Sequence, residues 1–119
     1  MRLNLASNSR NVHAGLTSYC FFNDGFHIAY IPSLDLSGYG DTPAEAVDML
    51  INVVVKDYFD NLLDLREQQI MNELRQYGWK QKPFLTKQLR NTKFYDPERI
   101  KHDFNLPAET ALHDQFVSV

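Results

Sequence analysis

The alternation of apolar and polar residues near the start of the chain predicts an antiparallel hairpin and a third strand. Residues 16–22 are rich in aromatic and other strand-forming side chains, and residues 26–31 alternate apolar with polar or small ones. The turn sequence Asn-Asp-Gly at 23–25 separates them, and this combination is a strong short-range hairpin signal. Pro32 ends the second strand because proline lacks a ladder N–H. Residues 34–39 alternate again and predict the third strand.

A long amphipathic helix is predicted to begin after the third strand. Thr42 is the expected N-cap, Pro43 stands at the first helical position and Glu45 completes a capping box. Apolar residues then recur at steps of three or four: Val47, Ile51, Val54, Tyr58, Leu62 and Leu65. The β-branched run 53–55 opposes a helix on propensity, but the cap and the sustained period outweigh it.

A second helix is predicted to end at Gly78. Its apolar stripe consists of Ile70, Leu74 and Tyr77, and glycine favours the left-handed conformation that ends helices. Trp79 then lies just past the stop, where it packs back on Leu74. We therefore interpret Trp79 as a hydrophobic lock rather than a platform for a ligand.

Beyond Trp79 the periodicity weakens, and the remaining elements are short. Residues 79–85 are our candidate for a fourth strand, 96–100 for a short helix and 115–119 for a final strand; residues 3–5 suggest one more strand at the start. The prediction is an α+β fold with an antiparallel three-stranded sheet, a long helix, a second helix and a fourth strand. We assign residues 1–85 to this domain and 86–119 to a C-terminal extension, packed on the domain or ordered on a partner.

Composition places the chain among ordinary globular domains. The 119 residues are 44% hydrophobic and 23% charged, with a net charge of −3. No stretch approaches the roughly 20 apolar residues of a membrane helix, and no leader-like apolar run occurs at the start. The single cysteine, Cys20, excludes an intrachain disulfide framework. We expect a soluble cytoplasmic protein.

The small net charge conceals two opposed segments. Residues 35–73 contain nine acids and two bases, whereas residues 75–101 contain eight bases and two acids. Such asymmetry is typical of one surface for a basic partner and another for an acidic one. The simpler alternative is that both segments are solvated faces that attract each other.

The residues that usually carry catalysis or bind metals show no matching pattern. Cys20 lies within a strand pattern, which favours a buried structural thiol, and no nucleophile motif is present. The four histidines lack ligand spacing. Glu45 and Asp48 share a helix face, but acids in the first helical turns are explained by the helix dipole. We therefore predict no catalytic residue, no metal and no cofactor.

The basic segment has one feature of single-strand binders, because its bases are interleaved with Trp79, Phe84, Phe94 and Tyr95. The candidate nucleic-acid contacts are Lys80, Lys82 and Lys87. Nucleic-acid binding through residues 75–101, of DNA or RNA and with a role as a transcriptional autoregulator, is thus an alternative function, although the segment contains no recognised nucleic-acid-binding motif.

The order of parts resembles the HicB-like antitoxin family over about residues 16–65. Its signature is roughly y-P-x-L-x-G in a strand and G-D-T-x-x-E-A at a helix start. The matching positions are Tyr30, Pro32, Leu34 (or Leu36), Gly38, Gly40, Asp41, Thr42, Glu45 and Ala46. This chain departs from the family in its extra helix, its longer N-terminus and a tail without a helix-turn-helix or ribbon-helix-helix pattern.

The resemblance implies a partial RNase H-like fold without nuclease activity. Active enzymes of that fold have an acid on the first strand, and residues 16–22 contain none. Members of the family neutralise a small basic toxin that cleaves mRNA (HicA-like), and many bind operator DNA through an added domain.

Our leading hypothesis is therefore a non-enzymatic protein-binding module that neutralises such a toxin. We expect a homo-oligomer, a dimer joined through an exposed sheet edge. The candidate partner contacts are Asp35, Tyr39 and Asp41, which flank the loop between third strand and helix. An orphan that keeps the fold without a toxin remains the other alternative.

Overall fold

One antiparallel sheet organises the fold. The computed structural model describes residues 1–5, 12–81, 88–93 and 95–119. The strands run in the order β4-β3-β2-β1-β6-β5, with β7 paired to the other edge of β2, so the structure is α+β, as predicted. The strands are β1 (Arg2–Leu5), β2 (Val12–Asn23), β3 (Phe26–Ile31), β4 (Leu36–Gly40), β5 (Lys80–Gln81), β6 (Gln88–Arg90) and β7 (His113–Ser118). The helical segments are α1 (Pro43–Met49), η1 (Leu50–Val55), α2 (Lys56–Leu63), α3 (Glu67–Arg75) and α4 (Pro97–Asp103).

The predicted hairpin is confirmed and closes through a two-residue turn. Asp24 and Gly25 both have positive φ, 51° and 83°, as a type I′ turn requires. Tyr19 of β2 lies opposite Tyr30 of β3, so these side chains share one face of the sheet. β4 begins at Leu36, two residues later than expected, because Asp35 adopts a left-handed φ of 52° in the turn before it.

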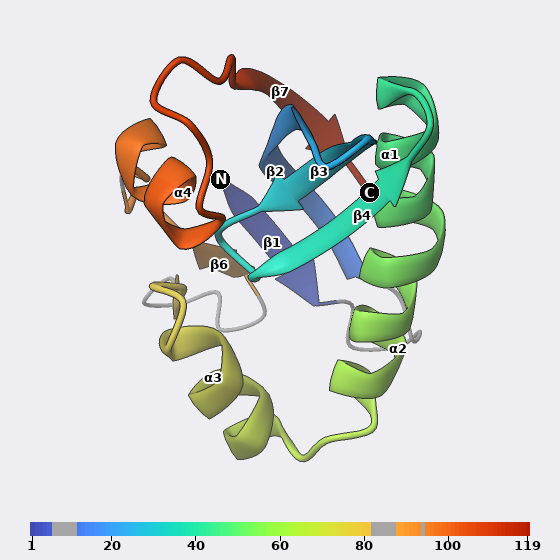
Figure 1. The fold of residues 1–119 in the computed structure, drawn as a ribbon. Helices are drawn as coiled ribbons and strands as arrows, with labels where there is room; N and C mark the ends of the chain where they lie inside the picture. The colour runs from blue at the N-terminus through green and yellow to red at the C-terminus, as the bar shows by residue number, and fades with distance from the viewer. Residues whose placement is uncertain (6–11, 82–87, 94) are drawn as a thin grey trace.

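The long helix is also confirmed, as one continuous unit of α1, η1 and α2 (Figure 1). Thr42 caps it by accepting a 3.1 Å hydrogen bond from the N–H of Glu45. The Glu45 carboxylate reaches back to the N–H of Asp41 at 2.9 Å, one residue before the expected position. The β-branched run that opposed a regular helix lies inside η1, which has π-helical hydrogen bonding.

Glycines let β4 approach this helix closely. A Cβ at position 38 would lie 2.6 Å from the backbone nitrogen of Leu50 and 2.8 Å from the carbonyl oxygen of Ala46. At position 40 it would lie 2.9 Å from the Ala46 nitrogen. The two glycines of the strand-to-helix segment therefore serve backbone packing.

The structure confirms that the second helix ends at Gly78 and that Trp79 packs in the core. Gly78 has φ 94°, its N–H bonds to the Arg75 carbonyl, and the N–H of Trp79 bonds to the Leu74 carbonyl. These are the two bonds of a Schellman motif. Trp79 is fully buried, and its Nε1 donates to the carbonyl of Ser33 at 2.7 Å.

The fourth-strand prediction at residues 79–85 needs correction. Only Lys80–Gln81 form a strand in the described part of this segment, and they pair with β6 at the far end of the sheet. The strand beside the hairpin is β7, from Gly15 opposite Ser118 to Cys20 opposite His113. Trp79 is not part of a strand, because its N–H bonds to the Leu74 carbonyl at the helix end and its side chain is buried in the core.

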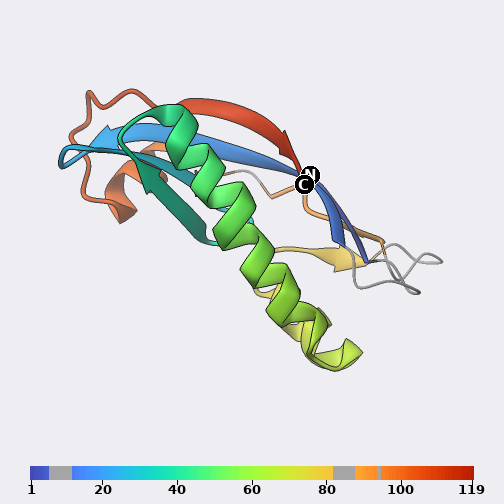
Figure 2. The same cartoon turned by 90° about the vertical axis from the view of Figure 1, so that its right-hand side faces the viewer.

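Helices lie on both faces of the sheet. The long helix crosses one face, and α4 lies on the other (Figures 1 and 2). On the α4 side, Phe104 packs edge-on against Phe21 and Tyr30, with ring centroids 5.1 and 4.9 Å apart. The described part of the extension thus adds β6, α4 and β7 to the same body. Within the described residues, no helix combines the length and apolarity needed to cross a membrane.

Candidate functional site

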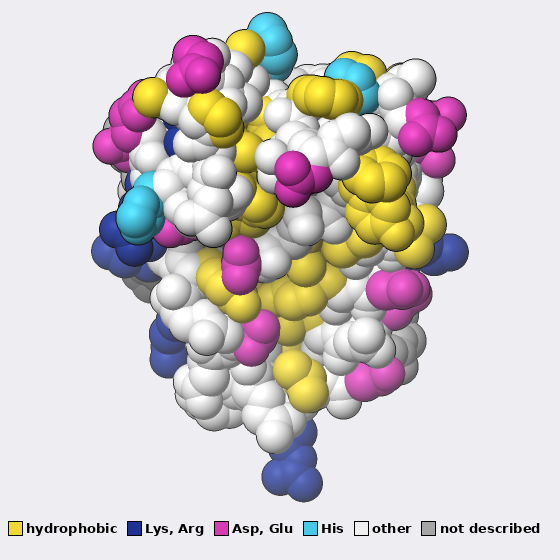
Figure 3. Space-filling view, viewed as in Figure 1, with side chains coloured by type: hydrophobic (Ala, Val, Ile, Leu, Met, Phe, Trp, Pro, Cys, Tyr) yellow, Lys and Arg dark blue, Asp and Glu magenta, His cyan; other side chains and the backbone are white. Residues whose placement is uncertain are grey.

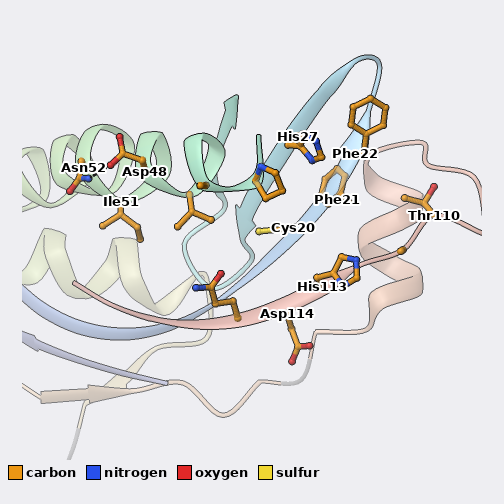
Figure 4. Close-up of a pocket in the computed structure, with 15 residues that line it drawn as sticks. Cys20, Phe21, Phe22, His27, Asp48, Ile51, Asn52, Thr110, His113 and Asp114 are labelled. Atoms are coloured by element: carbon orange, nitrogen blue, oxygen red, sulfur yellow. Dashed lines mark hydrogen bonds between the residues drawn. The ribbon is translucent and has the colours of Figure 1, made fainter. Parts of the chain in front are cut away.

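A large hollow in the described part of the chain is a groove between the long helix and β7. Its volume is about 1070 Å³. Val47 and Ile51 line it from the helix, Phe22 and His27 from the hairpin, and His113 from β7. Figure 4 shows the Cys20 sulfur between helix and strand, directed into this space. We call this hollow the helix–β7 groove.

The floor of the groove ends at an open strand edge. Among the described residues, β7 pairs only with β2, so its other side has no strand neighbour. Val119 and Ala14 exchange both backbone hydrogen bonds, at 2.9 and 3.0 Å. Since such pairs alternate in an antiparallel ladder, the N–H and C=O groups of Asp114, Phe116 and Ser118 point outward. An extended segment has hydrogen-bonding groups to pair with there.

The Cys20 thiol is not activated. Burial raises the pKa of this thiol above its ordinary value, although the Ser18 hydroxyl beside it acts in the opposite direction. A raised pKa keeps the sulfur protonated and therefore weakly nucleophilic at neutral pH. In the groove Cys20 acts as a small apolar side chain.

The polar residues that line the groove could contact a bound partner, but they do not form a metal site. Two imidazoles line it, but the described residues contain no group of three or more His, Cys, Asp or Glu side chains placed to hold a metal ion. The Asp48 carboxylate accepts a 2.6 Å hydrogen bond from the side-chain amide of Asn52. Asp48 and Asp114 are the two acids that line the groove.

A second apolar surface lies on the opposite face of the sheet. The rings of Phe26 and Tyr39 meet edge-on at 5.8 Å and remain 46% and 57% exposed. With Ile28 and Phe104 they border a hollow of about 460 Å³. In Figure 3 a band of hydrophobic side chains crosses this side along the line of β4, with acids on its borders. Exposed aromatic clusters of this kind are typical contact surfaces.

The structure separates the three predicted partner contacts. Asp35 lies before β4, where it accepts a 2.9 Å hydrogen bond from the Tyr30 hydroxyl. Tyr39 lies near the other end of β4 and joins the Phe26 cluster. Asp41 is exposed at the helix start, two residues before Pro43, which lines the groove. Asp41 is thus near one end of the groove in sequence but does not line it, and Tyr39 lies on the opposite face.

Only part of the basic segment, residues 75–101, is free to contact a nucleic acid in the described structure. Lys82 and Lys87 lie outside the described residues, while Lys80 is exposed on β5. Lys93 lies over the Tyr95 ring at 5.5 Å, Arg99 pairs with Asp103, and Lys101 pairs with Glu98. Trp79 is buried and cannot stack on a base.

The sequence interpretation missed Phe22, His113 and Phe116 as surface residues. Phe22 is 56% exposed and Phe116 is 60% exposed, although both occur in strand patterns. The signal for Phe22 was its place next to the turn, where a strand extends beyond the helix that covers it. No local signal marked β7 as an edge, because that depends on its pairing with β2.

Comparisons of the chain with protein-family models, with curated proteins and with solved structures found no match.

Proposed function

We propose that this chain is a non-catalytic protein-binding module whose partner adds a strand to β7 and inserts side chains into the helix–β7 groove. The observation that carries the proposal is the coincidence of an open strand edge with an apolar groove of about 1070 Å³ beside it. Strand addition supplies affinity through backbone hydrogen bonds, and neighbouring pockets supply specificity through alternate side chains.

Charge favours a small basic protein as the occupant. Asp48 lines the groove from the helix, Asp114 lies on β7 at its border, and the exposed Asp41 precedes Pro43 at the helix start. The helix above also presents exposed Glu45 and Asp57. Such acids steer a basic partner to the surface and raise the association rate more than the affinity. A HicA-like toxin, as the sequence resemblance implies, fits this description, and a second copy of the chain is the competing occupant.

The test first looks for a reading frame for a small basic protein beside the gene for this chain, and then uses that protein, with both proteins purified. Calorimetry measures the dissociation constant, and alkylation of Cys20 reports on the groove, because this is the chain's only cysteine. We expect the partner to slow alkylation at least tenfold. The absence of a basic neighbouring reading frame, or unchanged alkylation in a formed complex, contradicts the proposal.

Two matched pairs of variants locate the contact. Asp114→Pro removes an outward N–H that Asp114→Ala keeps, so we expect the proline variant to bind at least tenfold more weakly than the alanine variant. Ala44→Trp fills the groove, whereas Asn61→Trp adds the same side chain at an exposed site on α2. Equal affinities within both pairs would place the interface elsewhere.

Self-association is measured on the same variants by sedimentation. A dimer that Asp114→Pro converts to a monomer, with no binding of the basic protein, would assign the edge to a second copy.

A further inference from the structure

Three bases stand in a row across the end of the sheet far from the hairpin. Arg2 on β1 lies directly opposite Arg90 on β6, and Arg90 lies directly opposite Lys80 on β5. Residues directly opposite each other in a sheet point to the same side. All three are exposed, and the alternate positions, Leu3 and Leu89, are buried on the helix side. We call these three residues the cationic row; Figure 2 shows β1 and β5 at this end of the sheet.

The row is not neutralised within the described residues. Neither Arg2 nor Arg90 nor Lys80 forms an ion pair there, in contrast to Arg99 and Lys101. Like charges directly opposite each other destabilise a sheet. Lysine on an edge strand protects that edge from aggregation, which accounts for Lys80. It does not account for Arg2 and Arg90, whose strands have neighbours on both sides.

An exposed aromatic ring continues the row on the same face. Arg2 lies opposite Gly15 of β2, and the ring of Phe116 covers Gly15 so closely that a Cβ there would lie 2.5 Å from the ring's Cζ atom. Phe116 is 60% exposed. The face therefore presents, in order across the strands, a ring and three cations.

From this arrangement we infer that the cationic row and Phe116 form a binding surface for single-stranded nucleic acid. The cations contact successive phosphates, and an unpaired base stacks on the Phe116 ring. Single-strand binders combine a positive track for the backbone with aromatic platforms for the bases. A duplex offers no free base face to Phe116, and a purely acidic segment such as polyglutamate has no ring to stack on it. The bases of this surface lie on β1, β5 and β6, away from the groove, whereas Phe116 lies on β7, the strand that also borders the groove.

The experiment measures fluorescence anisotropy of labelled 12-nucleotide single strands, one DNA and one RNA, across a salt series. A duplex and a polyglutamate peptide are the comparison probes. Three phosphate contacts to a single strand predict a log–log salt slope of about −2, which is roughly a 20-fold loss between 50 and 200 mM salt. The DNA and RNA arms show which nucleic acid is bound more tightly.

Matched double variants test the row. Arg2→Gln with Arg90→Gln should weaken single-strand binding at least tenfold and lower the slope by about 1.4. Lys56→Gln with Arg75→Gln removes the same charge from exposed positions on α2 and at the end of α3, and should change little. Phe116→Leu keeps an apolar cover over Gly15 and should weaken binding roughly 5- to 150-fold. Thermal unfolding verifies that each variant is folded.

Three results would overturn the inference. Equal losses in the two double variants would mean that only net charge matters. Duplex affinity equal to single-strand affinity, with Phe116→Leu unchanged, would exclude stacking. Polyglutamate binding that depends on Arg2 and Arg90, with no oligonucleotide binding, would assign the row to an acidic protein.

Discussion

The indole Nε1 of Trp79 donates a 2.7 Å hydrogen bond to the backbone carbonyl of Ser33, 46 residues earlier in the chain. Both residues are fully buried. The bond joins the end of α3 to the turn between β3 and β4. It therefore fixes the second helix against the same part of the sheet that leads into the long helix.

Replacement of Trp79 by Phe should lower the free energy of unfolding by about 1–3 kcal/mol, because the Ser33 carbonyl loses its buried donor. The smaller ring adds a packing loss. Urea unfolding followed by far-ultraviolet circular dichroism measures the change, since the variant has no tryptophan fluorescence. A loss below about 0.5 kcal/mol, the range of ordinary surface substitutions, would show that water replaces the donor.

Gly38→Ala should destabilise the protein by roughly 1–3 kcal/mol, because its methyl group meets backbone atoms of the long helix that cannot rotate away. Ser37→Ala is the control, since Ser37 is the exposed neighbour on the same strand. Urea midpoints of the two variants give the comparison. Equal midpoints would mean that the helix shifts away from β4 at little cost.

Stability should fall as the pH rises above about 10. Burial raises the pKa of Tyr30 above the ordinary 10.0, and its hydrogen bond to Asp35 adds to the rise. Burial likewise raises the pKa of Tyr58, with a further rise from Glu73. The unfolded chain therefore loses these protons first, and stability present below pH 10 is lost as the pH rises toward the folded-state pKa. Each group contributes at most about 1.4 kcal/mol per pH unit.

The double variant Tyr30→Phe with Tyr58→Phe tests that account. Its urea midpoint should decline less between pH 9.5 and 11 than that of the parent chain. Parallel declines would assign the alkaline loss to other groups.

Cys20 should react with iodoacetamide more slowly than a cysteine in a short peptide at pH 8, because burial raises its thiol pKa. The difference should narrow as the pH rises and vanish in concentrated urea. Mass spectrometry of timed samples measures the rates. Faster reaction than the peptide would mean that the groove activates the thiol.

The sequence predicted the elements whose determinants are local. The Asp24–Gly25 turn, the Thr42 cap and the Gly78 stop each depend on a few adjacent residues, and all three are confirmed. The choice of strand neighbours was predicted poorly. Residues 79–85 and 115–119 are both short strand candidates, and the strand that pairs with β2 is set by contacts between residues 93 to 103 positions apart, from Cys20 opposite His113 to Gly15 opposite Ser118.

The candidate surfaces likewise depend on contacts between residues that are far apart in the sequence. Asp41 and Tyr39 flank the same loop in the sequence, but β4 ends at Gly40, so Tyr39 belongs to the strand and Asp41 to the start of the helix. Arg2, Arg90 and Phe116 meet only because β1, β2, β6 and β7 are neighbours, so a search along the sequence singled out the contiguous basic segment instead. The kinship with HicB-like antitoxins stays a prediction.

The pairing of β2 with β7 also sets an order of events during synthesis. The hairpin is complete at Ile31, yet one side of β2 has no partner until His113–Ser118 leave the ribosome. At about 5–20 residues per second, the intervening chain takes roughly 4–16 s to make. During that interval the nascent chain exposes an unpaired strand edge, to which another chain could pair.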